Sequence, residues 1–267
     1  MKIGIVTISY NQVKYLAQAI ESVHTSDPEQ LEYVMVDPGS TDGSREVIQR
    51  YRRRFQSVIL GPDEGPPDGL NKGFAQTSAE ILGYLNSDDT FAPGALDYVL
   101  QYFERHPETD VLCGAIRITG EDGRPGIRRR TPDRIDLRRY AYETCFFWQQ
   151  ATFFRREAFL KTGGFNVSSK TAWDGELVVD MALTGCRFAY TNKILGDFRI
   201  YGESITGSGR LSAALRNDRI HMREKILSAG VKPASSPEVR VMKVLYKFSL
   251  RRHWSYLFSG EELEAGR

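Results

Sequence analysis

The first hundred residues alternate between short apolar runs of strand length and segments whose apolar residues follow helical spacing. The expected strands lie at 3–8, 31–36, 58–60 and 81–85, and the expected helices at 13–24, 45–55, 69–76 and 94–105. This alternation predicts an α/β domain in which right-handed crossovers connect a parallel sheet. Ligands of such sheets bind beyond the carboxyl ends of the strands, so the residues that follow each strand are candidates for chemistry.

Beyond residue 110 the alternation weakens. The expected elements are strands at 111–118, 151–155 and 187–190, a helix at 173–183, and two further helices at 211–229 and 237–258. Residues 120–140 are rich in arginine, glycine and proline, which favours a loop, and we expect no regular sheet there. The pattern predicts an α/β domain at 1–208 and a C-terminal helical extension at 209–267.

The charge of the chain is nearly balanced. Its 267 residues include 36 Lys and Arg against 34 Asp and Glu, which gives no reason to expect nucleic acid as a partner. Three widely spaced cysteines, Cys113, Cys145 and Cys186, have no metal-ligand spacing and indicate reduced thiols. The apolar run at 3–8 is too short for a signal peptide or a membrane span, so we expect a cytoplasmic protein.

Polar and acidic segments follow the expected strands. They are Thr7-Ile8-Ser9-Tyr10-Asn11, the turn at 37–44, the glycine-rich stretch at 63–73, and Asn86-Ser87-Asp88-Asp89. Because parallel strands end at one edge of their sheet, these segments are expected to converge.

The pair Asp88 and Asp89 is the sharpest chemical feature of the chain. Adjacent carboxylates at the end of a buried strand repel each other unless a cation lies beside them. Mg²⁺ or Mn²⁺ fits this place, because hard cations bind carboxylate and phosphate oxygens together. The alternative is that Asp89 caps the following turn while Asp88 is solvated, and the residues alone leave both interpretations open.

Two further carboxylates lie on the turn after the second strand. Asp37 is placed to accept hydrogen bonds from a nucleotide base or ribose, as the acidic residue of dinucleotide folds does. Asp42 instead favours a role at the start of the helix expected at 45–55.

The order and spacing of these segments resemble the inverting family-2 glycosyltransferases over about residues 1–206. The segments that carry the resemblance are Thr7 to Asn11, the turn at 37–44, Asp68 to Gly73, Leu85 to Asp89, Gln150 to Arg156, Gly163-Gly164-Phe165, and Phe198-Arg199 through Gly202-Glu203-Ser204. The resemblance implies an α/β fold of the GT-A type, a Rossmann-like nucleotide-diphospho-sugar transferase with a mixed central sheet and a C-terminal helical extension. Residues 1–208 would then be the catalytic domain.

The resemblance also implies the donor site. The residues that would line the nucleotide are Thr7, Ser9, Asn11, Asp37 and Asp68, with Lys72, Asn86 and Ser87 nearby. Asp88 would be the principal ligand of Mn²⁺ or Mg²⁺, with Asp89 beside it. Asn86 stands where many relatives carry Asp. Tyr201 stands where many relatives carry a histidine able to bind the metal, and tyrosine is a poor ligand for Mg²⁺.

Asp174 stands where the family places the general base that deprotonates the acceptor hydroxyl. A helix cap for the segment that starts at Glu176 is the alternative role for Asp174, and Glu176 is the fallback base. The implied reaction transfers a sugar with inversion from a nucleoside-diphosphate sugar, most simply a UDP-sugar, to a glycan or lipid-linked acceptor in polysaccharide, glycan or glycolipid biosynthesis.

Other functions fit the sequence less well. A nucleotidyltransferase would carry a glycine-rich phosphate loop after the first strand, where this chain has Ser9-Tyr10-Asn11-Gln12. An NAD-dependent oxidoreductase would carry G-x-G-x-x-G there. A non-catalytic sugar- or lipid-binding protein of the same fold would have lost its carboxylates, and Asp88, Asp89 and Asp174 are all present.

Two basic segments complete the pattern. Arg128-Arg129-Arg130 and Arg138-Arg139 favour a solvated loop, with phosphate contact as the alternative. The segment 241–258 mixes basic with large apolar residues, which suits either an interfacial helix on the inner face of an anionic membrane or a helix docked on protein.

Overall fold

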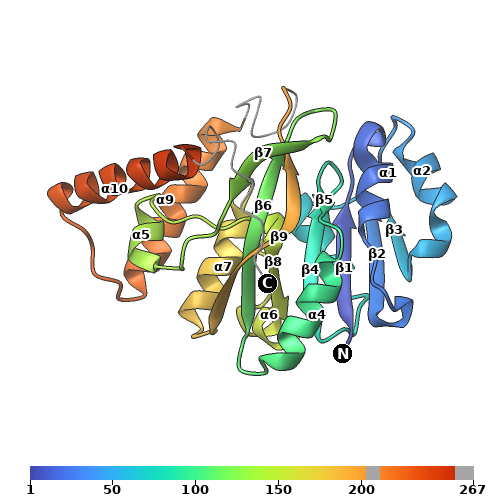
Figure 1. The fold of residues 1–267 in the computed structure, drawn as a ribbon, viewed down its shortest axis with the longest axis horizontal. Coiled ribbons are helices and arrows are strands. Elements are labelled where there is room, and N and C mark those ends of the chain that lie inside the picture. The colour runs from blue at the N-terminus through green and yellow to red at the C-terminus, as the bar shows by residue number, and fades with distance from the viewer. Residues whose placement is uncertain (203–210, 256–267) are drawn as a thin grey trace.

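Four strands from the first ninety residues form a parallel sheet in the order β3-β2-β1-β4 in the computed structural model, which describes residues 1–202 and 211–255. The strands are β1 (Ile3–Ile8), β2 (Leu31–Asp37), β3 (Ser57–Leu60) and β4 (Ile81–Asn86). Ile3 of β1 pairs with Leu31 of β2 on one side and with Ile81 of β4 on the other. The parallel arrangement predicted for this region is confirmed (Figure 1).

The sheet becomes mixed beyond β4. The further strands are β5 (Thr90–Phe91), β6 (Val111–Thr119), β8 (Thr152–Arg155) and β9 (Phe188–Arg199). β8 is antiparallel to both β4 and β6, β9 is parallel to β6, and β5 is antiparallel to β9. The mixed sheet expected of the GT-A fold is therefore present.

Two expectations about this half of the chain were wrong. β7 (Pro125–Arg130) pairs antiparallel with β6 where we expected no sheet, and α5 (Leu137–Ala141) follows it. β9 is also much longer than the expected strand at 187–190. Both strands carry polar residues that hide a strand pattern, and their backbone pairing with β6 supplies the stabilisation that local sequence does not show.

Helices cover both faces of the sheet. α1 (Val13–Ser22), α2 (Ser44–Arg50) and α4 (Ala95–Arg105) bury apolar side chains against one face, together with Ile3 and Ile5 of β1. α3 (Pro66–Phe74), α6 (Arg156–Thr162) and α7 (Trp173–Leu183) pack on the other face, which receives Val6. Because β1 is buried on both sides, its sequence is mostly apolar rather than alternating.

Two C-terminal helices, α9 (Ser212–Ser228) and α10 (Ser236–Ser255), lie at one end of the sheet beside α5 (Figure 1). Met222 and Ile226 of α9 share an apolar cluster with Ala141 of α5 and Val179 of α7. The Arg138 guanidinium of α5 donates to the Glu238 carboxylate of α10 at 2.9 Å. Within the described ranges, no helix has the length and apolarity needed to cross a bilayer.

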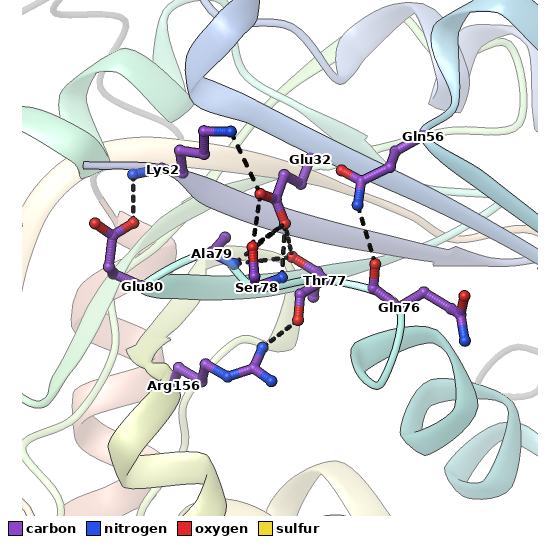
Figure 2. A network of polar contacts seen from close by, with 9 residues as sticks. All are labelled: Lys2, Glu32, Gln56, Gln76, Thr77, Ser78, Ala79, Glu80 and Arg156. Atoms are coloured by element: carbon purple, nitrogen blue, oxygen red, sulfur yellow. Dashed lines mark hydrogen bonds and ion pairs between the residues drawn. The ribbon is translucent and has the colours of Figure 1, made fainter.

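A buried carboxylate network closes the amino-terminal edge of the sheet (Figure 2). The Glu32 carboxylate accepts hydrogen bonds from the Thr77 hydroxyl at 2.6 Å, the Ser78 amide at 2.7 Å and the Ala79 amide at 3.2 Å. The Lys2 ammonium lies 3.6 Å from it. Although burial alone would raise the pKa of Glu32, these hydrogen bonds hold its pKa below the ordinary value.

Glu32→Gln is expected to destabilise the protein by about 1–3 kcal/mol, since two backbone donors lose a charged acceptor. A carboxyl whose pKa is lowered by folding stabilises the native state above its unfolded pKa, and that contribution disappears as the pH falls through its folded pKa. The difference in unfolding free energy between wild type and Glu32→Gln should therefore shrink as the pH falls below the ordinary value of 4.5. Urea unfolding at several pH values measures it, with exposed Glu157→Gln as the charge-matched control. A constant difference across this range would contradict the assignment.

Candidate active site

A cavity of about 1020 Å³ lies at the carboxyl ends of the parallel strands. One side is formed by the ends of the strands and the segments that follow them, with Ser9 after β1, Pro38 after β2, Asp63 after β3 and the run from Asn86 to Asp89 at the end of β4. The convergence expected from the topology is therefore present. The other side consists of α5, the segments 145–150 and 170–174, and the inner face of α9.

Ser9 and Asp37 each carry a buried oxygen that has no hydrogen-bond partner among the described residues. These atoms are Ser9 Oγ and Asp37 Oδ2. The other oxygen of Asp37 accepts from the Ser40 amide at 2.8 Å and from Arg45 Nε at 3.1 Å, which fixes the carboxylate in place. Burying a polar atom without a partner is costly, so both oxygens are suited to bind a ligand. Only Ser9 lines the cavity, whereas Asp37 precedes the cavity residue Pro38.

Asn11 and Asp42 join the loops after β1 and β2. Asn11 has a φ of 52°, and its side-chain oxygen accepts from the Thr41 amide at 2.9 Å. Asp42 accepts from the amides of Val13 and Ser44, both at 2.9 Å, at the starts of α1 and α2. Asp42 thus has the helix-start role that we favoured. Asn11 holds the loops together and does not line the cavity.

Four other predicted donor residues, Asp37 among them, do not line the cavity either. The Thr7 hydroxyl lies 3.0 Å from the Tyr33 hydroxyl inside the core, because successive side chains of a strand point to opposite faces. Asp68 and Lys72 pair with each other at 2.8 Å along α3. Asp63 lines the cavity instead, and burial raises its pKa. Asp68 was predicted from its position in the family motif, which does not show which carboxylate of the segment faces inward.

Asp88 and Asp89 line the cavity with Asn86 and Ser87, but the two carboxylates differ. Asp89 is almost fully buried, and its two oxygens accept from the Arg199 amide at 2.9 Å and from Gln150 Nε2 at 2.7 Å. Asp88 accepts from the Tyr201 hydroxyl at 3.1 Å. Burial raises the pKa of both carboxyls, most strongly that of Asp89.

These contacts limit which residues could hold a metal. The described part of the chain contains no cluster of three or more His, Cys, Asp or Glu arranged for a metal ion. Asp89 already uses both oxygens within the protein, so its expected role as a second ligand is not supported by its geometry. Asp88 alone fits a Mg²⁺ or Mn²⁺ ion whose other ligands are phosphate oxygens and water, the usual arrangement for Mg²⁺ beside a nucleotide.

Asp174 lies in the first turn of α7 and lines the cavity. Its Oδ1 accepts from the Gly175 amide at 2.7 Å, and burial raises its pKa. Glu176 does not line the cavity. Its carboxylate accepts from Asn166 Nδ2 at 3.0 Å and from the Lys225 ammonium at 3.0 Å. The fallback role of Glu176 as a base is therefore not supported. Asp174 and Glu176 are two residues apart on α7, so their side chains point in different directions, and only Asp174 lines the cavity.

The wall beside Asp174 is aromatic and basic, which the sequence analysis missed. Its aromatic residues are Tyr140, Phe146, Phe147, Trp148 and Trp173, and its cations are Lys170, Arg219 and Arg223. The run Phe146-Phe147-Trp148 was a usable signal, whereas the arginines come from a helix distant in the sequence. Arg128 has no described side chain, so phosphate contact, the alternative to a solvated loop there, stays untested. Glu203 and Ser204 of the resemblance lie outside the described residues.

The chain matches the family Glycosyl transferase family 2 over residues 4–163. It belongs to this family. An uncharacterised glycosyltransferase of Nostoc is 32% identical over 125 residues, which span 46% of this chain but only 39% of the relative. An uncharacterised glycosyltransferase of Mycobacterium tuberculosis is 28% identical over 222 residues, or 81% of this chain and 80% of the relative.

Solved structures show the same fold. S. aureus TarS 1-349, crystallised with UDP-GlcNAc, superposes with a TM-score of 0.68 at 20% identity, covering 96% of this chain and 73% of that crystallised chain. The likeness and the mixed sheet together establish the GT-A fold. This glycosyltransferase therefore has its cavity at the edge of the sheet where α/β folds bind ligands.

Proposed function

We propose that this glycosyltransferase moves a sugar from a UDP-sugar to an acceptor hydroxyl with inversion of the anomeric centre. The observation that carries the proposal is that Asp88, after β4, and Asp174, at the start of α7, line one cavity. One carboxylate that would hold a metal ion against the donor diphosphate, and a second that would deprotonate the acceptor, suit a single in-line displacement.

Ser9, which lines the cavity, and Asp37, which precedes the cavity residue Pro38, would bind the nucleoside. Each has a buried oxygen without a partner among the described residues. The family match and the fold shared with TarS, which was crystallised with UDP-GlcNAc, support a UDP-sugar. The test is a thermal-shift comparison of UDP, GDP and CDP with Mn²⁺. A nucleotide at about 100 times its dissociation constant raises the unfolding free energy by roughly 2.7 kcal/mol. Stabilisation by GDP or CDP but not by UDP would replace the donor assignment.

Asp88 would hold Mg²⁺ or Mn²⁺ against the donor diphosphate. Once bound, the ion neutralises the charge that develops on the departing diphosphate. Arg199 holds the backbone of this turn, because its Nε donates to the Asp88 carbonyl at 2.8 Å. The turn that presents Asp88 is thus fixed from both sides, by β4 and by β9.

Asp174 would accept the proton of the acceptor hydroxyl as that oxygen attacks the anomeric carbon. The new carbon–oxygen bond forms on the face opposite the leaving group, and the bond to the diphosphate breaks with its electron pair going to the phosphate oxygen. The raised pKa of Asp174 makes it a better proton acceptor than an ordinary aspartate. The aromatic wall suits an acceptor with sugar rings, because such rings pack on aromatic faces through their apolar C–H groups.

The exposed face of α10 supports contact with a membrane. Val241, Val244, Leu245 and Phe248 are 50–63% exposed and follow the i, i+3, i+4, i+7 spacing of one helix face. Next to this apolar stripe lie the exposed cations Arg240, Lys243 and Lys247. On the inner side, Tyr246 stacks on the cavity residue Phe146 at a ring distance of 5.3 Å. The helix therefore both docks on protein and presents a basic, apolar face, which suits an anionic bilayer carrying a lipid-linked acceptor.

Flotation with vesicles tests this membrane contact. We expect the protein to bind anionic vesicles at low salt and to ignore neutral ones, since each basic residue near the surface contributes about 1 kcal/mol. Val244→Glu with Phe248→Glu should abolish binding. Leu160→Glu is the control, because Leu160 is 61% exposed on α6, away from the stripe. If the stripe variant floats like wild type, or if the stripe proves to hold two copies together in light scattering, the membrane assignment fails. Trp254, Leu257 and Phe258, which we also expected to contribute, have no described side chains.

A further inference from the structure

A carboxylate on α9 holds the loop that leads into α7. Asp218 Oδ2 accepts hydrogen bonds from the Thr171 amide and the Thr171 hydroxyl, each at 2.7 Å. It also accepts from the amides of Lys170 at 3.1 Å and Ala172 at 3.3 Å. One oxygen atom thus accepts hydrogen bonds from every amide of the loop 170–172, although Asp218 lies 46 residues beyond Ala172.

This contact lies immediately before α7. Ala172 is the N-cap residue of α7, and its side chain makes no cap hydrogen bond. Asp218 accepts from the amides that precede the helix, including that of the N-cap residue, and a negative charge is favoured at this end of a helix. Although burial alone would raise the pKa of Asp218, the hydrogen bonds from Thr171 and its neighbours hold its pKa below the ordinary value, so the group is ionised at neutral pH.

The loop 170–172, which is bound by Asp218, leads directly into the first turn of α7, where the candidate base Asp174 lies. Lys170, Thr171, Ala172, Trp173 and Asp174 all line the cavity. Asp174 is thus two residues beyond the last amide that Asp218 accepts from. The opposing residues of α9 that line the cavity are Leu215, Arg219, Met222 and Arg223. Figure 1 shows α9 beside both α5 and α7. In the sequence, α9 lies beyond the segment 4–163 that matches the family.

We propose that Asp218 is a positioning residue: it fixes the loop 170–172 so that the first turn of α7 presents Asp174 to the acceptor. The inference rests on the proposed role of Asp174 as the base. In this proposal α9 contributes to the active site. The segment that matches the family, 4–163, ends before both Asp174 and Asp218, so the family match alone assigns neither residue. A misplacement of about 1 Å in a reacting group can cost about a hundredfold in rate.

The test is a double-mutant cycle in the full-length protein between Asp218→Ala and Asp174→Asn. We expect Asp218→Ala to lower kcat by about 10- to 100-fold while leaving the affinity for UDP within about twofold. In the Asp174→Asn background, Asp218→Ala should lower kcat by less than about twofold, because the group it positions is already lost. Asp218→Asn should recover part of the rate, since its side-chain oxygen can still accept from Thr171.

Lys225→Met is the matched control. Lys225 also joins α9 to α7, through the Glu176 carboxylate at 3.0 Å, but it does not touch the loop 170–172. We expect this variant to lower the melting temperature without lowering kcat. If Asp218→Ala does not fold, Asp218→Asn carries the same cycle.

The outcomes separate the two proposals. If Asp174→Asn keeps full turnover, the proposed mechanism fails, whatever Asp218 does. If Asp174→Asn is impaired and Asp218→Ala multiplies that loss by its full single-mutant factor, the positioning role is overturned while the base assignment stands. Equal losses of kcat in Asp218→Ala and Lys225→Met would reduce Asp218 to a purely structural contact.

Discussion

Asp174→Asn is expected to lower turnover by about 10²–10⁴-fold, the usual contribution of a positioned general base. The amide keeps the shape of the side chain and its contact with Gly175, but it cannot take a proton. A sugar hydroxyl is a weak nucleophile until that proton leaves. The affinity for UDP should change little, because the base contacts the acceptor rather than the nucleotide. Initial rates beside calorimetric UDP titrations give both quantities.

The pH dependence of the wild-type rate supplies a second readout. Burial raises the pKa of Asp174 above its ordinary value of 3.8, and a base works only when deprotonated. Activity should therefore fall as the pH is lowered through this raised pKa, so the acid limb of the profile should lie above pH 3.8. The buried hydroxyls of Tyr84 and Tyr140 face the same carboxyl, and both stay protonated in this range because burial raises their pKa values as well.

Glu176→Gln is the control for Asp174→Asn. Its carboxylate is engaged with Asn166 and Lys225, so its loss should lower stability more than turnover. A dead Glu176→Gln enzyme with an active Asp174→Asn enzyme would swap the two roles. Full activity in both would place the base elsewhere and leave a carbohydrate-binding role for the cavity.

Removing divalent cations is expected to weaken the binding of UDP by at least about thirtyfold. Losing one partner of a desolvated charge pair typically costs 2 kcal/mol or more, and each 1.4 kcal/mol is about tenfold in affinity. Asp88 and the diphosphate are both negative, so they repel each other without the ion. Calorimetric titration of UDP in EDTA, and then with Mn²⁺, measures the difference. Asp88→Ala should remove the response to Mn²⁺.

Asp89→Asn distinguishes a ligand from a scaffold. Asp89 accepts from the Arg199 amide and from Gln150, so this variant should lower the melting temperature while keeping the Mn²⁺ response. Equal UDP affinity in EDTA and in Mn²⁺, with Asp88→Ala unchanged, would rule out the metal and leave the diphosphate to protein groups such as Arg199.

Local sequence was enough to predict the parallel core and the helix at 173–183, which begins and ends at the expected residues. It was also enough to single out Ser9, Asp88 and Asp174, which line one cavity. The physical reason is that periodicity reports burial, and polar residues at strand ends are conspicuous against an apolar core.

Only the tertiary structure decided which neighbouring side chain faces the cavity. Thr7 turns to Tyr33 and Glu176 to Lys225, away from the cavity, while Asp89 lines the cavity but has its oxygens engaged by Gln150 and Arg199. Asp174 and Glu176 are two residues apart and have the same local chemistry, but packing sends them to different sides. The hold of Asp218 on the loop before α7 is of the same kind, because a hydrogen bond across 46 residues leaves no periodic trace in the sequence and exists only once α9 has packed beside α7.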